Sequence, residues 1–277
     1  MRNTARITTA VLAAGALTLG LTACGSDKDS GADANATLTV AATPTPQGEI
    51  LDYIKDNLAA KAGLELEVKE FTDHVTPDTA VQQGEVDANY FQHQPYLDDF
   101  NKENGTDIVA VPGATVHLEP LGLYTRSVKK LDALEKGATV ALPNDTTNEA
   151  RALKLLEAAG LIGLKPRRGY DATPGDVTSN PQGLKFKELE AAQLPRSLSD
   201  VDAAVVNGNY ALEARLSPAK DALAAESATD NPYADFLAVR KGDQDDPRVK
   251  KPAGLLTSPE VKKFIEDKYD GAVVAAF

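Results

Sequence analysis

The chain of 277 residues carries 29 Lys and Arg against 41 Asp and Glu, which gives a formal net charge of −12 at pH 7. With 42% hydrophobic and 25% charged residues, it has the composition of an ordinary globular protein, and its length allows two domains of moderate size. Such an acidic surface argues against binding nucleic acid and against electrostatic docking on anionic lipid.

The chain begins with a predicted secretory signal. A short basic region precedes an apolar run over residues 7–21, which is too short for a membrane span and typical of a signal peptide. The run ends in Leu-Thr-Ala-Cys24, which resembles the lipobox of bacterial lipoproteins; a plain signal with an incidental cysteine is the alternative. We therefore predict a lipoprotein signal peptide over residues 1–23, lipidation of Cys24 and a flexible, Gly/Ser/Asp-rich tether over residues 24–36.

After the tether, apolar residues recur first with the period of a strand and then with that of a helix. Prolines and glycines separate these stretches, and Gly63 follows the first helical stripe as a natural stop. In chain order, we predict a strand at residues 38–41, a loop at 43–48, a helix over 50–62, a strand at 64–69 and a short helix beginning at 76.

The same order returns in the second half of the chain. Thr146 and Glu149 match a capping box at the start of a helix, and Gly160 marks its end. We predict a strand at residues 138–142, a loop at 143–146, a helix up to 159, a strand at 184–189 and a short helix at 195–199.

Each pass ends in Val-Asp-Ala followed by asparagine and tyrosine, so two alternating β/α lobes are the economical interpretation. Ligands of such sheets bind at the carboxyl ends of the strands, which predicts a cleft between the lobes. We expect residues 121–124 and 236–239 to cross between lobes and a final helix around residues 261–265 to pack on the first lobe. The predicted boundaries are 37–124 plus 236–277 for lobe 1 and 125–235 for lobe 2.

Residues 87–96, Asp-Ala-Asn-Tyr-Phe-Gln-His-Gln-Pro-Tyr, concentrate three aromatic rings, an imidazole and three amides in ten positions. This combination suits a pocket for a small solute with apolar and polar parts. The alternative is a strand end whose rings feed the core, because buried aromatic side chains are ordinary core material.

Two further polar positions are candidates for the same cleft. Arg151 lies in the second turn of a capped helix, where its guanidinium can grip a carboxylate in a bidentate manner; an exposed arginine paired with Asp145 is the alternative. Asn207 and Asn209 follow an apolar strand and can orient polar groups of a solute, although asparagine is equally a turn residue.

The chain has three histidines, and His74, His93 and His117 could together form a zinc site. None of them has the close spacing of a helical metal motif, so a metal receptor is kept as the alternative function. Nucleophile and phosphate-loop motifs are absent, and Cys24 is the only cysteine, so we predict neither an enzyme, a cofactor nor a disulfide.

Taken together, these motifs resemble the NlpA/MetQ family of methionine-binding lipoproteins over nearly all of the mature chain. The resemblance implies a two-lobed, periplasmic-binding-protein-like α/β fold with the ligand cleft between lobes. It also implies a lipid-anchored receptor at the outer side of the cell membrane that delivers methionine to an ABC permease and its ATPase. The residues that carry it are 87–96, 140–151, 189–198, 206–210 and 231–233.

The resemblance assigns roles to individual positions. Arg151 takes the place of the family's carboxylate-binding arginine, Asn207 would bind main-chain polar groups, and the thioether side chain would be surrounded by Phe91, His93 and Tyr96.

This chain departs from the family at two positions, which leaves D-methionine, methionine peptides and other apolar amino acids open. His74 replaces the usual tyrosine beside the side chain of the ligand. Asp235 replaces the usual asparagine, and its carboxylate could pair directly with a ligand ammonium.

Overall fold

The computed structural model describes residues 36–166 and 169–277. The predicted signal peptide, the lipidation site Cys24 and nearly all of the predicted tether therefore lie outside the described residues. No helix in the described part of the chain is both long and apolar enough to cross a membrane.

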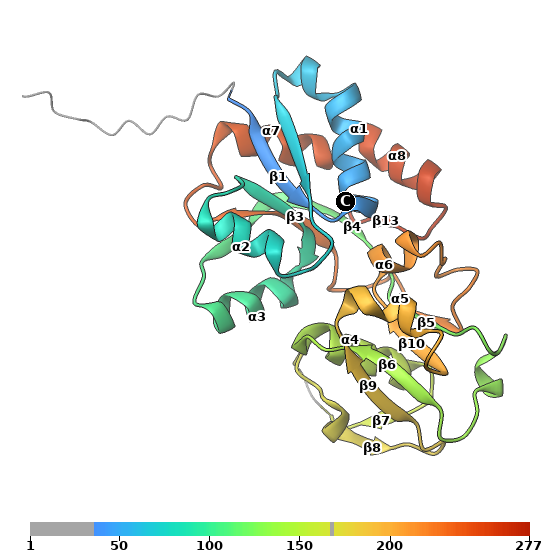
Figure 1. Cartoon of the computed structure of the whole chain (residues 1–277). Helices are drawn as coiled ribbons and strands as arrows, with labels where there is room; N and C mark the ends of the chain where they lie inside the picture. Colours follow the sequence, from blue (N-terminus) through green and yellow to red (C-terminus); the bar gives the residue numbers. More distant parts are fainter. Residues whose placement is uncertain (1–35, 167–168) are drawn as a thin grey trace, which may run out of the picture. The chain divides into compact units, whose positions relative to one another are not determined.

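A six-stranded mixed sheet contains both ends of the described chain (Figure 1). Strand β1 pairs in parallel with β2 and β3, whereas β12 runs antiparallel to both β3 and β4. The strand order is β13-β4-β12-β3-β1-β2, with bounds β1 Leu38–Ala42, β2 Leu66–Glu70, β3 Ala88–His93, β4 Ile108–Leu118, β12 Asp235–Arg240 and β13 Val274–Ala275.

Helices cover both faces of this sheet because its strands carry apolar side chains on both sides. The larger core lies under α1, α7 and α8, and the smaller one lies under α2 and α3. Val261 and Ile265 of α8 are fully buried in the larger core, which confirms the predicted packing of the final helix. The bounds are α1 Glu49–Asn57, α2 Thr76–Gln83, α3 Gln94–Asn104, α7 Pro247–Leu256 and α8 Pro259–Tyr269.

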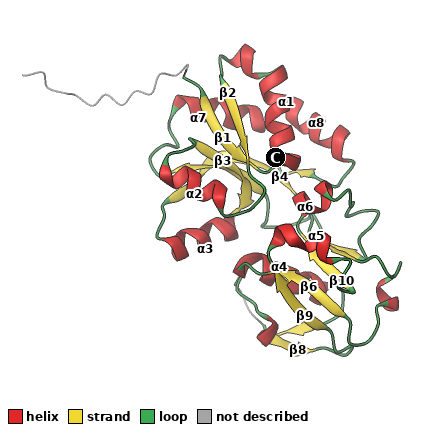
Figure 2. Cartoon of the chain, in the orientation of Figure 1, coloured by secondary structure: helices red, strands yellow, loops and turns green. Residues whose placement is uncertain are grey.

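A five-stranded sheet forms from the middle of the chain (Figure 2). Helix α4 buries its apolar stripe on one core of this sheet, and α5 and α6 bury theirs on the other. The strand order is β11-β5-β10-β6-β9, and a separate hairpin is formed by β7 and β8. The bounds are β5 Gly122–Tyr124, β6 Thr139–Pro143, α4 Thr146–Ala158, β7 Gly163–Leu164, β8 Val177–Ser179, β9 Lys185–Leu189, α5 Leu194–Ser197, β10 Ala203–Val206, α6 Gly208–Glu213 and β11 Ala224–Ala225.

The repeated Val-Asp-Ala motif makes the same contact in both sheets. In the first sheet, the Asp87 carboxylate accepts a hydrogen bond from the backbone N–H of Thr39 at 2.9 Å. In the second, the Asp202 carboxylate accepts one from Thr139 at 2.7 Å. Each aspartate therefore holds its strand beside the first strand of its own sheet, and the predicted duplication is present in the structure.

The structure differs from the sequence-based assignment in several places. Helix α4 is capped by Asp145, whose side chain accepts the N–H of Asn148, one residue before the predicted cap Thr146. Strand β4 is long and was not predicted, because Pro112 and the left-handed Gly113 interrupt its alternating pattern and the pairing register with β12 shifts there.

The strands expected to cross between lobes also fall differently. β5 pairs with β10 in the five-stranded sheet, although the predicted boundary placed residues 122–124 with lobe 1. β12 already begins at Asp235 in the six-stranded sheet, although that residue was placed in lobe 2. The sequence placed both boundaries at the ends of apolar runs, whereas the hydrogen-bonded partner strand decides sheet membership.

Candidate functional site

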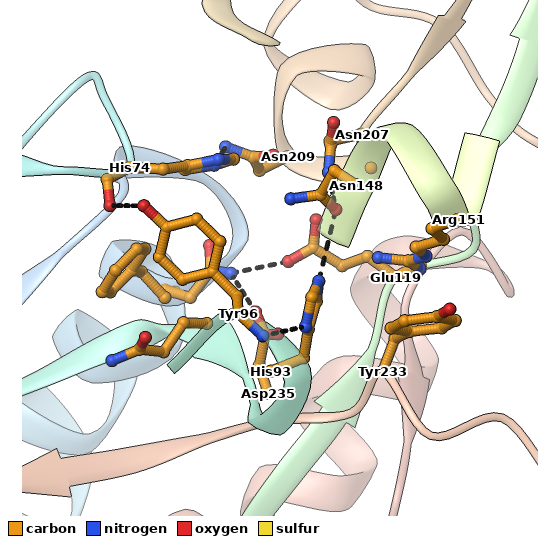
Figure 3. A pocket seen from close by; sticks show the side chains of 14 residues that line it. His74, His93, Tyr96, Glu119, Asn148, Arg151, Asn207, Asn209, Tyr233 and Asp235 are labelled. Carbon is orange, nitrogen blue, oxygen red and sulfur yellow. Dashed lines mark hydrogen bonds between the residues drawn. The ribbon is translucent and has the colours of Figure 1, made fainter. Parts of the chain in front are cut away.

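One pocket collects polar and aromatic side chains from segments of both sheets (Figure 3). The space between its side chains, counted together with the opening to solvent, is about 390 Å³. All seven residues that the sequence predicted to bind ligand line it. The complete lining, called the central pocket below, is Gln47, His74, Phe91, Gln92, His93, Tyr96, Glu119, Asn148, Arg151, Asn207, Gly208, Asn209, Tyr233 and Asp235.

The pocket lies at strand and helix ends, as expected for open α/β sheets. Strand β3 ends at His93, and Tyr96 follows in the first turn of α3. In the other sheet, β10 ends at Val206, so that Asn207 becomes the N-cap of α6. Helix α4 begins after β6 and presents Arg151 from its second turn. The repeated strand-loop-helix order therefore positions polar side chains from both sheets toward one space.

Arg151 is 4% exposed and is fixed on three sides. Its Nε and Nη2 donate to Oε1 and Oε2 of Glu226 at 2.8 and 2.6 Å, and Nη2 also donates to the carbonyl of Glu119 at 2.9 Å. The ring of Tyr233 lies 4.3 Å from the guanidinium carbon. Burial lowers the pKa of Arg151, but the Glu226 carboxylate outweighs it and raises the pKa above its ordinary value. The predicted alternative of an exposed arginine paired with Asp145 is wrong.

Aromatic rings form the opposite side of the pocket from Arg151 (Figure 3). The His74 ring lies 5.9 Å from that of Phe91, 6.2 Å from that of Tyr96 and 4.9 Å from that of Tyr210, between centroids. The Tyr96 hydroxyl donates to the backbone carbonyl of His74 at 2.7 Å. Burial lowers the pKa of His74, which favours the neutral ring. The cluster therefore offers an apolar surface with a polarisable imidazole.

His93 is held in one tautomer. Its Nδ1 accepts the backbone N–H of Tyr96 at 3.2 Å, so Nε2 carries the proton and faces Oδ1 of Asn148 at 3.2 Å. Burial and the nearby Arg151 lower the pKa of His93 to about 3, so the ring is neutral. Oδ1 of Asn148 also accepts from Nδ2 of Asn207 at 2.9 Å. Asn148 thus joins β3 of one sheet to α6 of the other.

The amide oxygen of Asn207 is buried and has no hydrogen-bond partner among the described residues. A buried acceptor without a partner is costly, and in a pocket it is a natural position for a ligand N–H group. Because Asn207 already donates its Nδ2 to Asn148, its carbonyl remains the part that can meet a ligand.

Glu119 and Asp235 are the two acids in the pocket lining, and Gln47 forms hydrogen bonds with both. Nε2 of Gln47 donates to Oε1 of Glu119 at 2.6 Å and to Oδ2 of Asp235 at 2.9 Å. Burial raises the pKa of Glu119 to about 8 and that of Asp235 to about 7. Behind them, His117 contacts Glu119 through Nε2 at 2.9 Å, and the hydroxyl of Tyr90 hydrogen-bonds the other ring nitrogen.

The three histidines considered as an alternative zinc site do not form a ligand set in the described part of the chain. His74 lines the central pocket among aromatic rings, and His93 lines it in contact with the amide of Asn148. His117 is fully buried behind Glu119. Within the described chain, the group that brings metal-ligating atoms within 4.8 Å of one another is His117, Glu119 and Asp235. The amide of Gln47 donates a hydrogen bond to both carboxyl groups of that set.

Several lining residues were not predicted as ligand contacts from the sequence. Among them are Gln47, Glu119, Asn148 and Tyr233. Asn148 and Tyr233 lie inside motifs that carried the family resemblance, so each had a sequence signal. Gln47 lies in a proline-rich loop that by itself indicates only a turn.

The comparisons with known proteins match nearly the whole described chain. The NlpA lipoprotein family model covers residues 38–277. The chain belongs to the NlpA lipoprotein family. Within this family, it is 43% identical over 258 residues to the methionine-binding lipoprotein MetQ of Bacillus subtilis, covering 92% of this chain and 93% of the relative. It is 38% identical over 266 residues to the D-methionine-binding lipoprotein MetQ of Escherichia coli, covering 95% and 96%.

A solved structure has the same fold as this chain. A nutrient-binding protein from Burkholderia cenocepacia, whose structure was solved bound to methionine, is 47% identical and superposes with a TM-score of 0.83. The match covers 87% of this chain and all of the other. The α/β, binding-protein-like fold predicted from the sequence is therefore confirmed for this member of the NlpA lipoprotein family.

Proposed function

We propose that this NlpA lipoprotein is the substrate-binding component of an ABC importer and binds L-methionine, or a closely related amino acid, in the central pocket. The observation that carries the proposal is the convergence of all seven predicted ligand contacts in that pocket, with Arg151 on one side, His74 and Tyr96 on the other and the acid Glu119 between them. The names of its relatives and the methionine-bound Burkholderia structure support this choice of ligand.

Each part of the pocket suits one part of an amino acid. Nη1 of Arg151 would bind the carboxylate, while Oδ1 of Asn207 and the carboxylate of Asp235 would take the ammonium and its neighbouring main-chain atoms, so opposite charges meet at both ends of the zwitterion. The rings of His74, Phe91, His93 and Tyr96 would surround the thioether, since sulfur packs favourably against aromatic rings.

We also propose that the two sheets belong to lobes that close over the ligand by hinge motion and present it to a membrane permease with its ATPase. The lobes are those predicted from the sequence, with residues 122–124 reassigned to the second and Asp235 to the first. A lipid on Cys24 would hold the protein at the outer side of the cell membrane. Its relatives are named as binding lipoproteins, which supports a non-enzymatic role.

Calorimetry tests the proposal. The protein is unfolded, freed of copurified ligand, refolded and titrated with L-methionine, D-methionine and other apolar amino acids. We expect saturable binding of methionine and a loss of about 100-fold or more in affinity for Arg151→Lys, because lysine cannot reproduce the planar guanidinium contacts.

Arg248→Lys is the matched control for this titration. Arg248 also makes a paired contact with a carboxylate, that of Asp246, but it does not line the central pocket. Its substitution should leave the affinity unchanged. Absence of binding heat with every amino acid, or equal effects of the two substitutions, would remove the proposed function. Mass spectrometry of the ligand released on first unfolding identifies the natural occupant.

A further inference from the structure

Glu226 does not line the central pocket, but it accepts two hydrogen bonds from Arg151, which does. Both of its carboxylate oxygens accept from Arg151, through Nε at 2.8 Å and Nη2 at 2.6 Å. The side chains of Arg151 and Glu226 are 5% and 11% exposed, so the pair is screened little by solvent. A bidentate contact of this kind fixes the plane of the guanidinium as well as its position.

Glu226 is itself fixed by the backbone. It follows β11, and its N–H donates to the carbonyl of Leu121 at 2.9 Å. The N–H of Leu121 donates back to Oε2 of Glu226 at 2.9 Å. The carboxylate is therefore anchored to the segment that leads from β4 into β5, and this segment also contains the Glu119 carbonyl that accepts from Arg151.

This arrangement leaves one nitrogen of Arg151 for a ligand. Nε and Nη2 are engaged, and Tyr233 covers one face of the guanidinium. Within the described residues, Nη1 has no hydrogen-bond acceptor, and Arg151 lines the central pocket. A ligand carboxylate would thus meet a guanidinium whose charge is already compensated.

The charge balance of the pocket follows from this pair. The other ionisable side chains in the lining are histidines, tyrosines, Glu119 and Asp235, and none of them is a permanent cation. The positive charge of Arg151 is offset by Glu226, so an entering anion gains little from the field of the site as a whole. A zwitterion differs because its ammonium can interact with the acids while its carboxylate reaches Nη1.

We propose that Glu226 is a positioning and specificity-determining residue: it orients Arg151 and cancels its charge, so that the site accepts an amino-acid zwitterion and rejects a carboxylate that lacks the ammonium. The proposal rests on the proposed binding of methionine and deepens it by assigning how the ligand class is selected.

The test compares two ligands that differ only in the ammonium. L-Methionine and its des-amino analogue, 4-(methylthio)butanoate, are titrated into refolded wild type and Glu226→Gln. In the wild type, methionine should bind about 100-fold more tightly than the analogue. In Glu226→Gln, the uncompensated charge of Arg151 should favour the analogue and reduce this selectivity about 10-fold or more. A purely structural role would weaken both ligands equally and leave their ratio unchanged.

Two further variants make the result specific. Glu226→Asp keeps the charge with a shorter reach and should retain selectivity within about threefold of the wild type, even where affinity falls. Glu213→Gln removes an exposed acid of α6 and should leave the selectivity unchanged.

Three outcomes overturn the proposal: an unchanged ratio in Glu226→Gln, lost selectivity in Glu226→Asp, or a wild type that binds both ligands within about threefold. The third outcome is measured on the wild type alone, so it tests the proposal even if Glu226→Gln does not fold. A wild type that binds no methionine at all would instead remove the proposed function.

Discussion

Buried ionisable side chains make the pocket respond to pH at the level of single residues. Glu119 and Asp235 have pKa values raised to about 8 and about 7 by burial, against ordinary values of 4.5 and 3.8. The buried histidines shift the other way: burial lowers the pKa of His93 to about 3 and that of His117 to about 4. Burial thus shifts the acids toward the protonated form and the imidazoles toward the neutral form, whereas a ligand ammonium beside the acids would favour their carboxylates.

The stability of the protein should change between pH 8 and pH 6.5. Over this interval, the native protein takes up protons on Glu119 and Asp235, whereas the unfolded chain, with ordinary pKa values, does not. The free energy of unfolding should therefore rise as pH falls from 8 to 6.5. At pH values near and below 6.5, the histidines of the unfolded chain take up protons before the buried histidines of the native protein do. This proton uptake lowers the free energy of unfolding and opposes the gain from the two acids.

Urea unfolding of the ligand-stripped protein at pH 8 and pH 6.5 measures this change. Glu119→Gln, which carries no titrating proton at that position, should reduce the gain. A gain of the same size in the variant would show that Glu119 is not its source.

At the scale of elements, the close approach of α6 to the segment after β4 decides the shape of the pocket. Gly208 is the first residue of α6, and a Cβ built on it would lie 2.5 Å from Cβ of Glu119 and 2.8 Å from its carboxylate. Real Cβ atoms do not approach so closely, so any side chain at this position would push the two elements apart. Glycine is required here by contact rather than by backbone conformation.

We therefore predict that Gly208→Ala weakens methionine binding about tenfold or more, because displacement of α6 moves Asn207 and Glu119 relative to each other. Calorimetry measures the affinity, and circular dichroism checks that the fold is kept. Gly254→Ala in α7 is the control, since a Cβ there meets no atom within 4 Å. Wild-type affinity in Gly208→Ala would contradict the proposed rigid contact.

At the scale of the whole molecule, the proposed location depends on the N-terminal lipid. The net charge is −12, so the protein itself has no general electrostatic attraction to anionic membranes. Acyl chains on Cys24 would supply the attachment instead. Residue 24 lies outside the described residues, and its role rests on the lipobox-like sequence that precedes it.

Cys24→Ser should move the protein from the membrane fraction to the soluble fraction of the producing cells or their medium, because no acyl chain can be attached to serine in this way. Fractionation followed by immunoblotting measures the distribution. Methionine affinity should stay within about twofold of the wild type, since the pocket begins only at Gln47. Retention of the variant on membranes would contradict lipid anchoring through Cys24.

Much of this protein is readable from local sequence. The order of strands and helices and the position of Gly160 after α4 depend on contacts between near neighbours or on simple periodicity. The motifs around Phe91, Arg151 and Asn207 indicated the candidate pocket because polar residues followed strands in both halves. Such signals survive in a single sequence because their causes are local.

Only the tertiary structure decided which distant residues meet. Glu226 lies 75 positions from Arg151, and nothing in the sequence around either indicates that they pair. Strand β4 was missed because its pairing with β12, rather than its own pattern, keeps it extended across Pro112 and Gly113. Register and packing between separate segments determine such contacts, so the sequence determined the elements and the candidate residues, whereas the fold determined their partners and their charge.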